Sequence, residues 1–255
     1  MRTLRFLLAF PALFAALSRG VCAEPAKPPE CGSCHQAIVA RDFVHGPIAA
    51  GACEACHTGE KPGPAHHTFS LTQPQPGLCL TCHEDLRSVV ESSKVKHPAI
   101  EGGGCTACHD PHGSAERLFL KEKEMDAVCA ACHGSRIGEK TVHAPAKASC
   151  VLCHQPHGSK NKRLLKDRLP NLCLECHDDV RTALASKHAH GAVKSGCLTC
   201  HDPHSTPNPS LLKGDGEKAL CRSCHKTVAA HSKAAKRPHA ALEAGCTACH
   251  VPHGS

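Results

Sequence analysis

The chain has 255 residues, with 21 cysteines, 23 histidines, six phenylalanines, no tryptophan, no tyrosine and a formal charge of +7. Globular cores rely on aromatic and branched side chains, so this composition excludes an ordinary domain whose interior is filled by side chains. Cysteine at about 8% of the residues is instead typical of a chain held together by covalent or metal links.

The N-terminal residues 1–23 have the pattern of a secretory signal peptide. Arg2 and Arg5 precede an apolar run at positions 6–17, which is too short to span a bilayer. Small residues at 21–23 predict cleavage after Ala23, followed by a Pro-rich linker at 24–30. The alternatives to this cleavage are an uncleaved membrane anchor and a lipoprotein whose lipid is attached to Cys22. We expect a periplasmic protein with no membrane span, with an extracellular or outer-membrane-associated location left open.

All twenty cysteines after residue 23 fall into ten C-x-x-C pairs, and a histidine follows every pair. C-x-x-C-H is the attachment signature of c-type haem. The motifs are Cys31/Cys34/His35, Cys53/Cys56/His57, Cys79/Cys82/His83, Cys105/Cys108/His109, Cys129/Cys132/His133, Cys150/Cys153/His154, Cys173/Cys176/His177, Cys197/Cys200/His201, Cys221/Cys224/His225 and Cys246/Cys249/His250.

The spacing within the motif follows from haem chemistry. Two thiols add across the two vinyl groups of one porphyrin edge, and the adjacent histidine binds the iron from one face. Zinc sites, thioredoxin-like centres and disulfides also use paired cysteines, but none of them requires a histidine after each pair. The sequence therefore predicts haem c, ten per chain, with these ten histidines as proximal iron ligands.

Two kinds of motif alternate along the chain. First-kind motifs begin at Cys31, Cys79, Cys129, Cys173 and Cys221, and Leu or Val usually precedes them. Second-kind motifs usually follow Gly or Ser and lead into Pro-His, except in the first repeat, where His66 or His67 has to take that place. The period predicts a linear array in which neighbours contact neighbours. We expect five two-haem repeats, at about 31–78, 79–128, 129–172, 173–220 and 221–255.

Regular secondary structure is expected to be sparse. Short helices are predicted at 84–93 and 178–187, while Pro and Gly interrupt the rest and no strand pattern is convincing. The predicted fold is a multihaem cytochrome c, mostly irregular with short α-helices and little or no β-structure, forming an elongated array. Cofactor binding then supplies the folding energy.

Thirteen histidines lie outside the motifs, and ten of them can serve as second axial ligands. Five precede a second-kind motif by seven or eight residues, four belong to Pro-His, and one of His66 and His67 completes the set. Met125 is the only methionine after residue 23, so bis-histidine haems of low potential are expected. The distal candidates are His45, His66, His67, His97, His112, His143, His157, His190, His204, His239 and His253; His188 and His231 are expected to face solvent.

The reach of the chain restricts how these ligands are shared. His253 follows His250 by three residues, which extend at most about 10–11 Å. Imidazoles on opposite faces of one haem need backbones about 12 Å or more apart, so His253 has to serve another haem. We assign it to Cys221/Cys224 and, by repetition, His204 to Cys173/Cys176, His157 to Cys129/Cys132, His112 to Cys79/Cys82, and His66 or His67 to Cys31/Cys34. His45, His97, His143, His190 and His239 are each assigned to the second-kind haem that follows; ligation between non-adjacent repeats is the alternative.

From Cys31 onward the chain resembles the multihaem cytochromes with doubled C-x-x-C-H motifs, and most of all the periplasmic decahaem cytochromes of outer-membrane electron conduits. The most specific stretch is CHQPHGSKNKRLLKDRLPNLCLECH at 153–177. The resemblance implies bis-histidine haems stacked as a wire, redox protein partners that donate and accept electrons, and in some relatives an outer-membrane porin partner.

An iron with two protein ligands has no open site for substrate, so the sequence predicts an electron carrier without catalytic residues. We expect it in an anaerobic respiratory or extracellular electron-transfer chain. The alternatives are a nitrite or sulfur-oxyanion reductase with one open haem, and a polymerising extracellular cytochrome. The basic stretches at 160–168 and 233–237 are expected to face solvent, because a chain this poor in aromatics lacks the stacking residues of nucleic-acid-binding proteins.

Overall fold

The computed structural model describes residues 30–59, 68–102, 104–237 and 239–255. The predicted signal peptide, positions 24–29 of the predicted linker, and His66 and His67 lie outside these residues. In the described part of the chain no helix has the length and apolar character needed to cross a bilayer.

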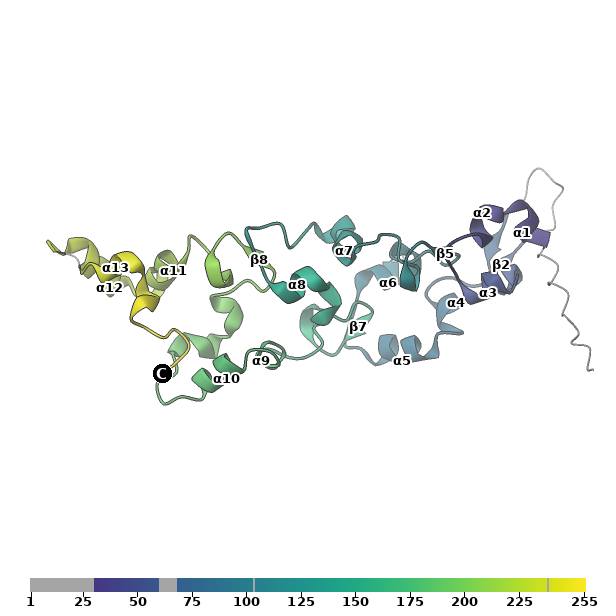
Figure 1. The fold of residues 1–255 in the computed structure, drawn as a ribbon. Coiled ribbons are helices and arrows are strands. Elements are labelled where there is room, and N and C mark those ends of the chain that lie inside the picture. The colour runs from purple at the N-terminus through teal and green to yellow at the C-terminus, as the bar shows by residue number, and fades with distance from the viewer. Residues whose placement is uncertain (1–29, 60–67, 103, 238) are drawn as a thin grey trace, which may run out of the picture.

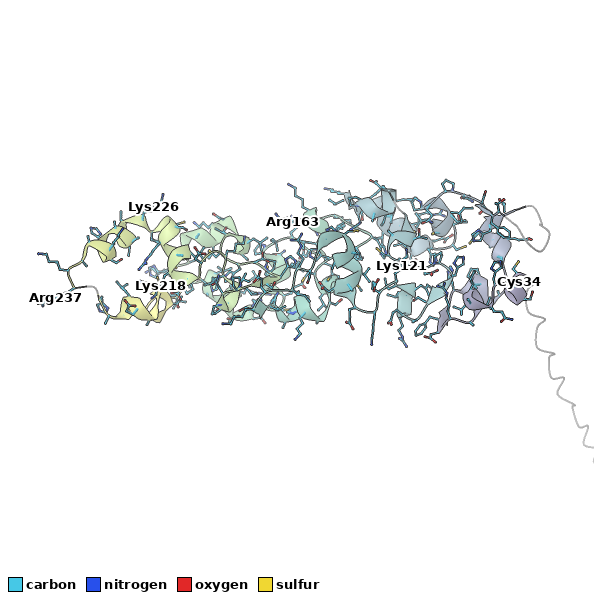
Figure 2. The ribbon with its side chains drawn as sticks, turned by 90° about the horizontal axis from the view of Figure 1, so that it is seen from above. Cys34, Lys121, Arg163, Lys218, Lys226 and Arg237 are labelled. Atoms are coloured by element: carbon cyan, nitrogen blue, oxygen red, sulfur yellow. The ribbon has the colours of Figure 1, made fainter. Side chains whose placement is uncertain are left out.

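The molecule is elongated, and the chain advances along the long axis from its purple end to its yellow end (Figure 1). Seen from above, Cys34 lies near one end and Arg237 at the other, with Lys121 and Arg163 between them (Figure 2). The C-terminus turns back towards the middle of the molecule, where the His188 N–H donates a hydrogen bond to the Ser255 carbonyl at 3.2 Å. This shape agrees with the predicted linear array.

The α-helices are short, with four to nine residues each. Those predicted at 84–93 and 178–187 are present as α5 and α10; each begins directly after a proximal histidine and carries two acidic residues in its first turn, where the helix dipole favours negative charge. The α-helices are α1 (Glu30–Cys34), α2 (Gln36–Val39), α3 (Gly46–Ala49), α4 (Gly77–Leu80), α5 (Glu84–Ser92), α6 (Pro98–Gly102), α7 (Met125–His133), α8 (Ala144–Ala148), α9 (Asn171–Leu174), α10 (Asp178–Leu184), α11 (Glu217–Cys224), α12 (Lys226–Ala234) and α13 (Ala241–Ala244).

The two kinds of motif differ in backbone conformation. First-kind motifs begin in α-helices, whereas every second-kind motif forms a single 3₁₀ turn. The 3₁₀ turns are η1 (Cys53–Ala55), η2 (Cys105–Ala107), η3 (Arg117–Phe119), η4 (Cys150–Leu152), η5 (Lys162–Leu164), η6 (Gly191–Ser195), η7 (Cys197–Thr199), η8 (Pro209–Leu211) and η9 (Cys246–Ala248).

The strands have two residues each and pair antiparallel, which agrees with the expectation of little β-structure. Three of the four pairs join segments from successive repeats: β1 with β5, β4 with β7, and β6 with β8. The strands are β1 (Phe43–Val44), β2 (His57–Thr58), β3 (Ser70–Leu71), β4 (Val95–Lys96), β5 (Gly113–Ser114), β6 (Thr141–Val142), β7 (Gly158–Ser159) and β8 (Ser205–Thr206).

Side chains fill very little of the interior. Leu80 and Val90 are the buried hydrophobic residues in the described ranges. The accessible surface of 19909 Å² is nearly twice the roughly 10,800 Å² that the scaling for compact monomers gives at this mass. Basic side chains of the 160–168 stretch, including Lys160, Lys162 and Arg163, are exposed as predicted. The polypeptide therefore leaves space along its length that its own side chains do not occupy.

Candidate functional site

Histidine rings meet in eight pairs along the described part of the chain, between the motifs at Cys53 and Cys221. Each pair joins a histidine of a C-x-x-C-H motif to one of the predicted distal histidines, with 5.9–6.2 Å between ring centroids. The pairs are His83–His45, His57–His112, His133–His97, His109–His157, His177–His143, His154–His204, His225–His190 and His201–His253.

This separation fits a metal held between two imidazoles. A metal–nitrogen bond of about 2 Å on each side, plus about 1.2 Å from nitrogen to ring centre, places the centroids roughly 6.4 Å apart. In direct van der Waals stacking, ring planes approach to about 3.5 Å. The rings therefore stand as two axial ligands of one haem iron would. The structure describes no cluster of three or more His, Cys, Asp or Glu side chains arranged around a metal.

The pairs differ from the assignments made from reach. His253 pairs with His201 of the Cys197/Cys200 motif, whereas Cys221/Cys224 was predicted. The reach argument correctly separated His253 from His250 but chose the nearer of two upstream haems. The other corrected assignments are His204 to Cys150 and Cys153, His157 to Cys105 and Cys108, His112 to Cys53 and Cys56, His45 to Cys79 and Cys82, His97 to Cys129 and Cys132, His143 to Cys173 and Cys176, and His190 to Cys221 and Cys224.

Backbone pairing between repeats explains the corrected partners. The short strand before one distal histidine pairs with the strand that follows the Pro-His of the next repeat, which brings two distal histidines side by side. The N–H of His45 donates to the His112 carbonyl at 3.3 Å, and the N–H of His143 to that of His204 at 2.9 Å. Further pairs of this kind are His190 with His253, joined at 3.2 Å, and His97 with His157, brought together by β4 and β7.

At two of these contacts the glycine after Pro-His permits the close approach, whereas Ser205 takes that place after His204. Gly113 has φ +134°, and a Cβ there would collide with the backbone of Phe43 on the paired strand. Gly254 has φ +155°, and a Cβ on it would collide with the Ala183 carbonyl. Side-chain-bearing residues adopt such angles only with strain, so glycine is required at both positions. Each coupled pair thus places one predicted distal imidazole beside the C-x-x-C-H histidine of each of two neighbouring motifs.

A repeated turn holds the proximal histidine of three second-kind motifs. His109, His154 and His201 each place Nδ1 2.7–2.9 Å from the carbonyl oxygen nine residues later. The accepting residues are Leu118, Arg163 and Ser210, whose φ values are +61°, +59° and +54°.

Left-handed backbone is uncommon for residues other than glycine. Its recurrence at the same position of three turns indicates that the turn is constrained so that its carbonyl reaches the histidine Nδ1. An Nδ1–H that donates to this carbonyl leaves the lone pair of Nε2 free for iron. Sequence reasoning missed these acceptors. The Leu-Lys that follows three of the Pro-His sequences at a similar spacing was the available signal, because Lys166 closes the turn by donating its N–H to the Cys153 carbonyl at 2.9 Å.

Two distal histidines show the same arrangement. Nδ1 of His45 lies 2.9 Å from the Pro111 carbonyl, and Nδ1 of His143 lies 3.0 Å from that of Pro203. His97 differs, because its Nδ1 accepts the Ala99 N–H at 3.1 Å. A neutral ring in this state carries its proton on Nε2, so binding iron through Nε2 requires this contact to give way.

The cysteine thiols of successive motifs lie close together. Burial raises the pKa of Cys129 to about 11, and the nearby thiols of Cys150 and Cys108 add to this rise. The same influence of neighbouring motifs acts on four other thiols. In each case the pKa of the first thiol is raised by thiols of neighbouring motifs: Cys53 by Cys31, Cys79 by Cys105 and Cys56, Cys173 by Cys197 and Cys153, and Cys221 by Cys246 and Cys200. The predicted attachment points thus form a continuous row in sequence order.

None of the predicted thioether cysteines is paired in a disulfide in the described part of the chain. Those that are exposed include Cys82 and Cys249, whereas Cys56 is half-buried beside Cys79. Haem attachment at Cys56, Cys82 and Cys249 therefore stays a prediction from the C-x-x-C-H motif, as it does at the other seventeen cysteines.

Hydrogen bonds join two first-kind motifs to the second-kind motif that follows each; we call each such contact a polar clamp. The Thr247 N–H donates to the Glu217 carboxylate at 2.8 Å and its hydroxyl donates at 3.0 Å, and the backbone bond is the main cause of the lowered pKa of Glu217. Gln75 plays the same part for another motif, because the Thr106 N–H donates to its Oε1 at 3.3 Å.

An apolar pocket accompanies the His109–His157 pair. Burial is the main cause of the lowered pKa of His157, which matches a ring enclosed by apolar side chains. The pocket is lined by Cys105 as well as both rings, so one predicted thioether cysteine and two predicted axial ligands share the same apolar surroundings. It is lined by Pro76, Leu80, Leu86, Val90, Ile100, Cys105, His109 and His157.

The ends of the array are less complete. His239, expected to serve the haem of Cys246 and Cys249, makes no ring contact with His250 in the described part of the chain; its Nδ1 accepts the Ala241 N–H at 3.2 Å. His188 and His231 are exposed, as predicted. The expected partners of His35, which are His66 and His67, lie outside the described residues.

Comparison with known proteins gives these features a family. Four segments match the family described as Doubled CXXCH motif, at residues 45–88, 97–138, 143–182 and 190–230, and together they cover more than half of the chain. The chain belongs to this family. It is a multihaem c-type cytochrome, as its motifs and paired rings indicate.

Each matched segment of this cytochrome begins at a distal histidine. It then covers one second-kind motif and the first-kind motif that follows. This register differs from the predicted repeats, which began at first-kind motifs. Each matched segment instead contains one complete ring pair, such as His45 with His83. The motifs at Cys31 and Cys246 lie outside the four segments, so five repeats remain a prediction.

One relative of this cytochrome is Multiheme cytochrome MtrA from Shewanella baltica (strain OS185). The two chains are 35% identical over 151 residues, which cover 58% of this chain and 44% of that protein. The chain thus matches less than half the length of that relative.

Proposed function

We propose that this cytochrome is a periplasmic electron-transfer protein that passes electrons along ten bis-histidine c-type haems, in an anaerobic respiratory or extracellular electron-transfer chain. The main support is the set of eight imidazole pairs with centroids 5.9–6.2 Å apart. An iron with imidazoles on both faces has no vacant position, so the cofactor contributes reversible one-electron chemistry there.

The polypeptide supplies binding, orientation and spacing. Contacts between thiols of successive motifs support a continuous row of haems, because haems attached to neighbouring thiols would also be neighbours. Carbonyls that accept the Nδ1–H of axial rings fix ring orientation and leave Nε2 for iron. We also propose redox proteins as donor and acceptor at the ends of the row, with an outer-membrane porin as a further partner.

Coulometry of the holoprotein tests this function. We expect reversible uptake of ten electrons per chain, all from low-spin haem, and no carbon monoxide adduct of the reduced protein. A rapidly forming adduct on one haem would instead support a reductase with an open iron. Concentration-dependent assembly, measured by light scattering, would support the polymerising alternative.

A further inference from the structure

The four described Pro-His ligands differ in the residue two positions earlier. Asp110 precedes His112, Gln155 precedes His157, Asp202 precedes His204, and Val251 precedes His253. The four histidines otherwise occupy equivalent places, since each pairs with a second-kind proximal histidine. The chain therefore contains an internal comparison in which one neighbouring side chain varies.

Asp202 lies directly behind the imidazole of His204. Its Oδ1 is 3.2 Å from Nδ1 of that ring and also accepts the His204 backbone N–H at 3.0 Å. The carboxylate thus holds both the backbone and the ring of the residue whose imidazole meets His154, with centroids 6.1 Å apart.

Asp110 makes a weaker version of the same contact. Its Oδ1 lies 3.4 Å from Nδ1 of His112 and accepts the backbone N–H of that residue at 3.0 Å. Its other oxygen forms an ion pair with Arg41, which offsets part of the negative charge. At the two remaining sites, Gln155 is uncharged and Val251 has no hydrogen-bonding group in its side chain.

We propose that Asp202, and to a lesser degree Asp110, are positioning residues that lower the reduction potential of the haem whose axial ligand they contact. A carboxylate that accepts the Nδ1–H makes the imidazole a stronger donor, and stronger donation stabilises the ferric state. This inference rests on the proposed haem ligation.

The four sites are then ordered by potential. The His154–His204 haem is the lowest, the His57–His112 haem is next, and the His109–His157 and His201–His253 haems are higher. Low and high sites therefore alternate among the second-kind haems along the row. The polypeptide sets this pattern with one residue per site.

Spectroelectrochemical titration of holoprotein variants tests the assignment. Asp202→Asn keeps an oxygen for the His204 N–H but removes the charge, so about one tenth of the haem absorbance should shift to higher potential. Gln155→Asp should shift about one tenth to lower potential, for the converse reason. Asp215→Asn, which removes an exposed charge, is the matched control and should leave the curve unchanged.

The outcomes separate the inference from the function on which it rests. Unchanged curves for both Asp202→Asn and Gln155→Asp, in protein that loads haem and reduces reversibly, would overturn the tuning role and leave electron transfer standing. Failure of the unmodified protein to reduce reversibly would overturn the proposed function itself. If Asp202→Asn loses haem, the Gln155→Asp titration decides alone, because that variant adds a carboxylate where none is needed for folding.

Discussion

The imidazoles of His201 and His253 lie 6.0 Å apart between ring centroids, although two complete motifs, beginning at Cys221 and Cys246, separate them in the sequence. The chain thus passes through two further C-x-x-C-H motifs before it returns a histidine to the motif that precedes them. Repeated along the array, this arrangement makes every described repeat depend on its neighbour, and no described repeat is complete alone.

Replacing His253 by alanine should open the haem on Cys197 and Cys200. About one haem in ten should become high-spin and bind carbon monoxide after reduction, because one axial ligand is lost. Visible spectroscopy of the holoprotein measures both changes.

The control locates the open site. In a variant that lacks Cys197 and Cys200, His253→Ala should add no carbon monoxide adduct. In a variant that lacks Cys221 and Cys224, it should still add one. The reverse pattern would restore the assignment predicted from chain reach.

The ring orientations predict a mixed set of electron paramagnetic resonance spectra. Seven of the eight described pairs have ring planes 10–32° apart, whereas the planes of His97 and His133 are 88° apart. Perpendicular axial rings leave two ferric d-orbitals nearly degenerate, so this haem should give a strongly anisotropic low-spin signal beside rhombic ones. Low-temperature spectra of the oxidised protein check this, and a purely rhombic set would contradict the geometry.

The clamp between Glu217 and Thr247 should make the C-terminal motif sensitive to acid. The pKa of Glu217 is lowered in the folded state, so its stabilising effect is present above the ordinary glutamate pKa and is lost as pH falls through the folded value. Glu217→Gln keeps an acceptor for the Thr247 N–H but should remove this pH dependence. Because solvent screens this carboxylate, the unfolding free energy at neutral pH should change by at most about 1 kcal/mol.

Denaturant titrations of the holoprotein at about pH 7 and about pH 3 bracket the glutamate transition. Gln75→Glu, which places a carboxylate against Thr106, is the matched reciprocal variant and should introduce the same dependence. Identical pH profiles for the unmodified protein and Glu217→Gln would show that the contact does not contribute to stability.

Haem attachment should reverse the charge of the chain. The formal charge is +7, and removal of Arg2, Arg5 and Arg19 with the predicted signal peptide leaves about +4. With ionised propionates each ferric haem adds a charge of about −1, so ten haems would give a holoprotein with a net charge of about −6. Isoelectric focusing should therefore give an acidic value, and binding to basic partners should weaken with salt. A holoprotein that focuses above about pH 8 would contradict this.

The sequence was informative where the chemistry is local. The motif at Cys197 and Cys200 is recognised from five adjacent residues, and the helix after His83 is indicated by its first-turn acids. Distal candidates were also recognisable, because His97 and His157 recur at fixed positions. These features need no knowledge of distant contacts.

The partner of each distal histidine was not predictable in the same way. It depends on two-residue strands, such as Val95–Lys96 with Gly158–Ser159, which are too short to produce an alternating hydrophobic pattern. The glycine that follows some Pro-His sequences carried part of the missing signal, since Gly113 and Gly254 are needed where two backbones touch. The turn at Leu118 was missed because leucine does not favour a positive φ.

Intact-mass measurement, combined with a pyridine haemochrome assay, tests the central claim most directly. Every cysteine after residue 23 belongs to a C-x-x-C-H motif, and successive motifs lie in one row. The account predicts ten covalently attached haems per mature chain and no free thiol, with Cys56, Cys82 and Cys249 bonded like the rest. Nine or fewer haems in fully matured protein, or thiols that react with an alkylating reagent, would contradict it.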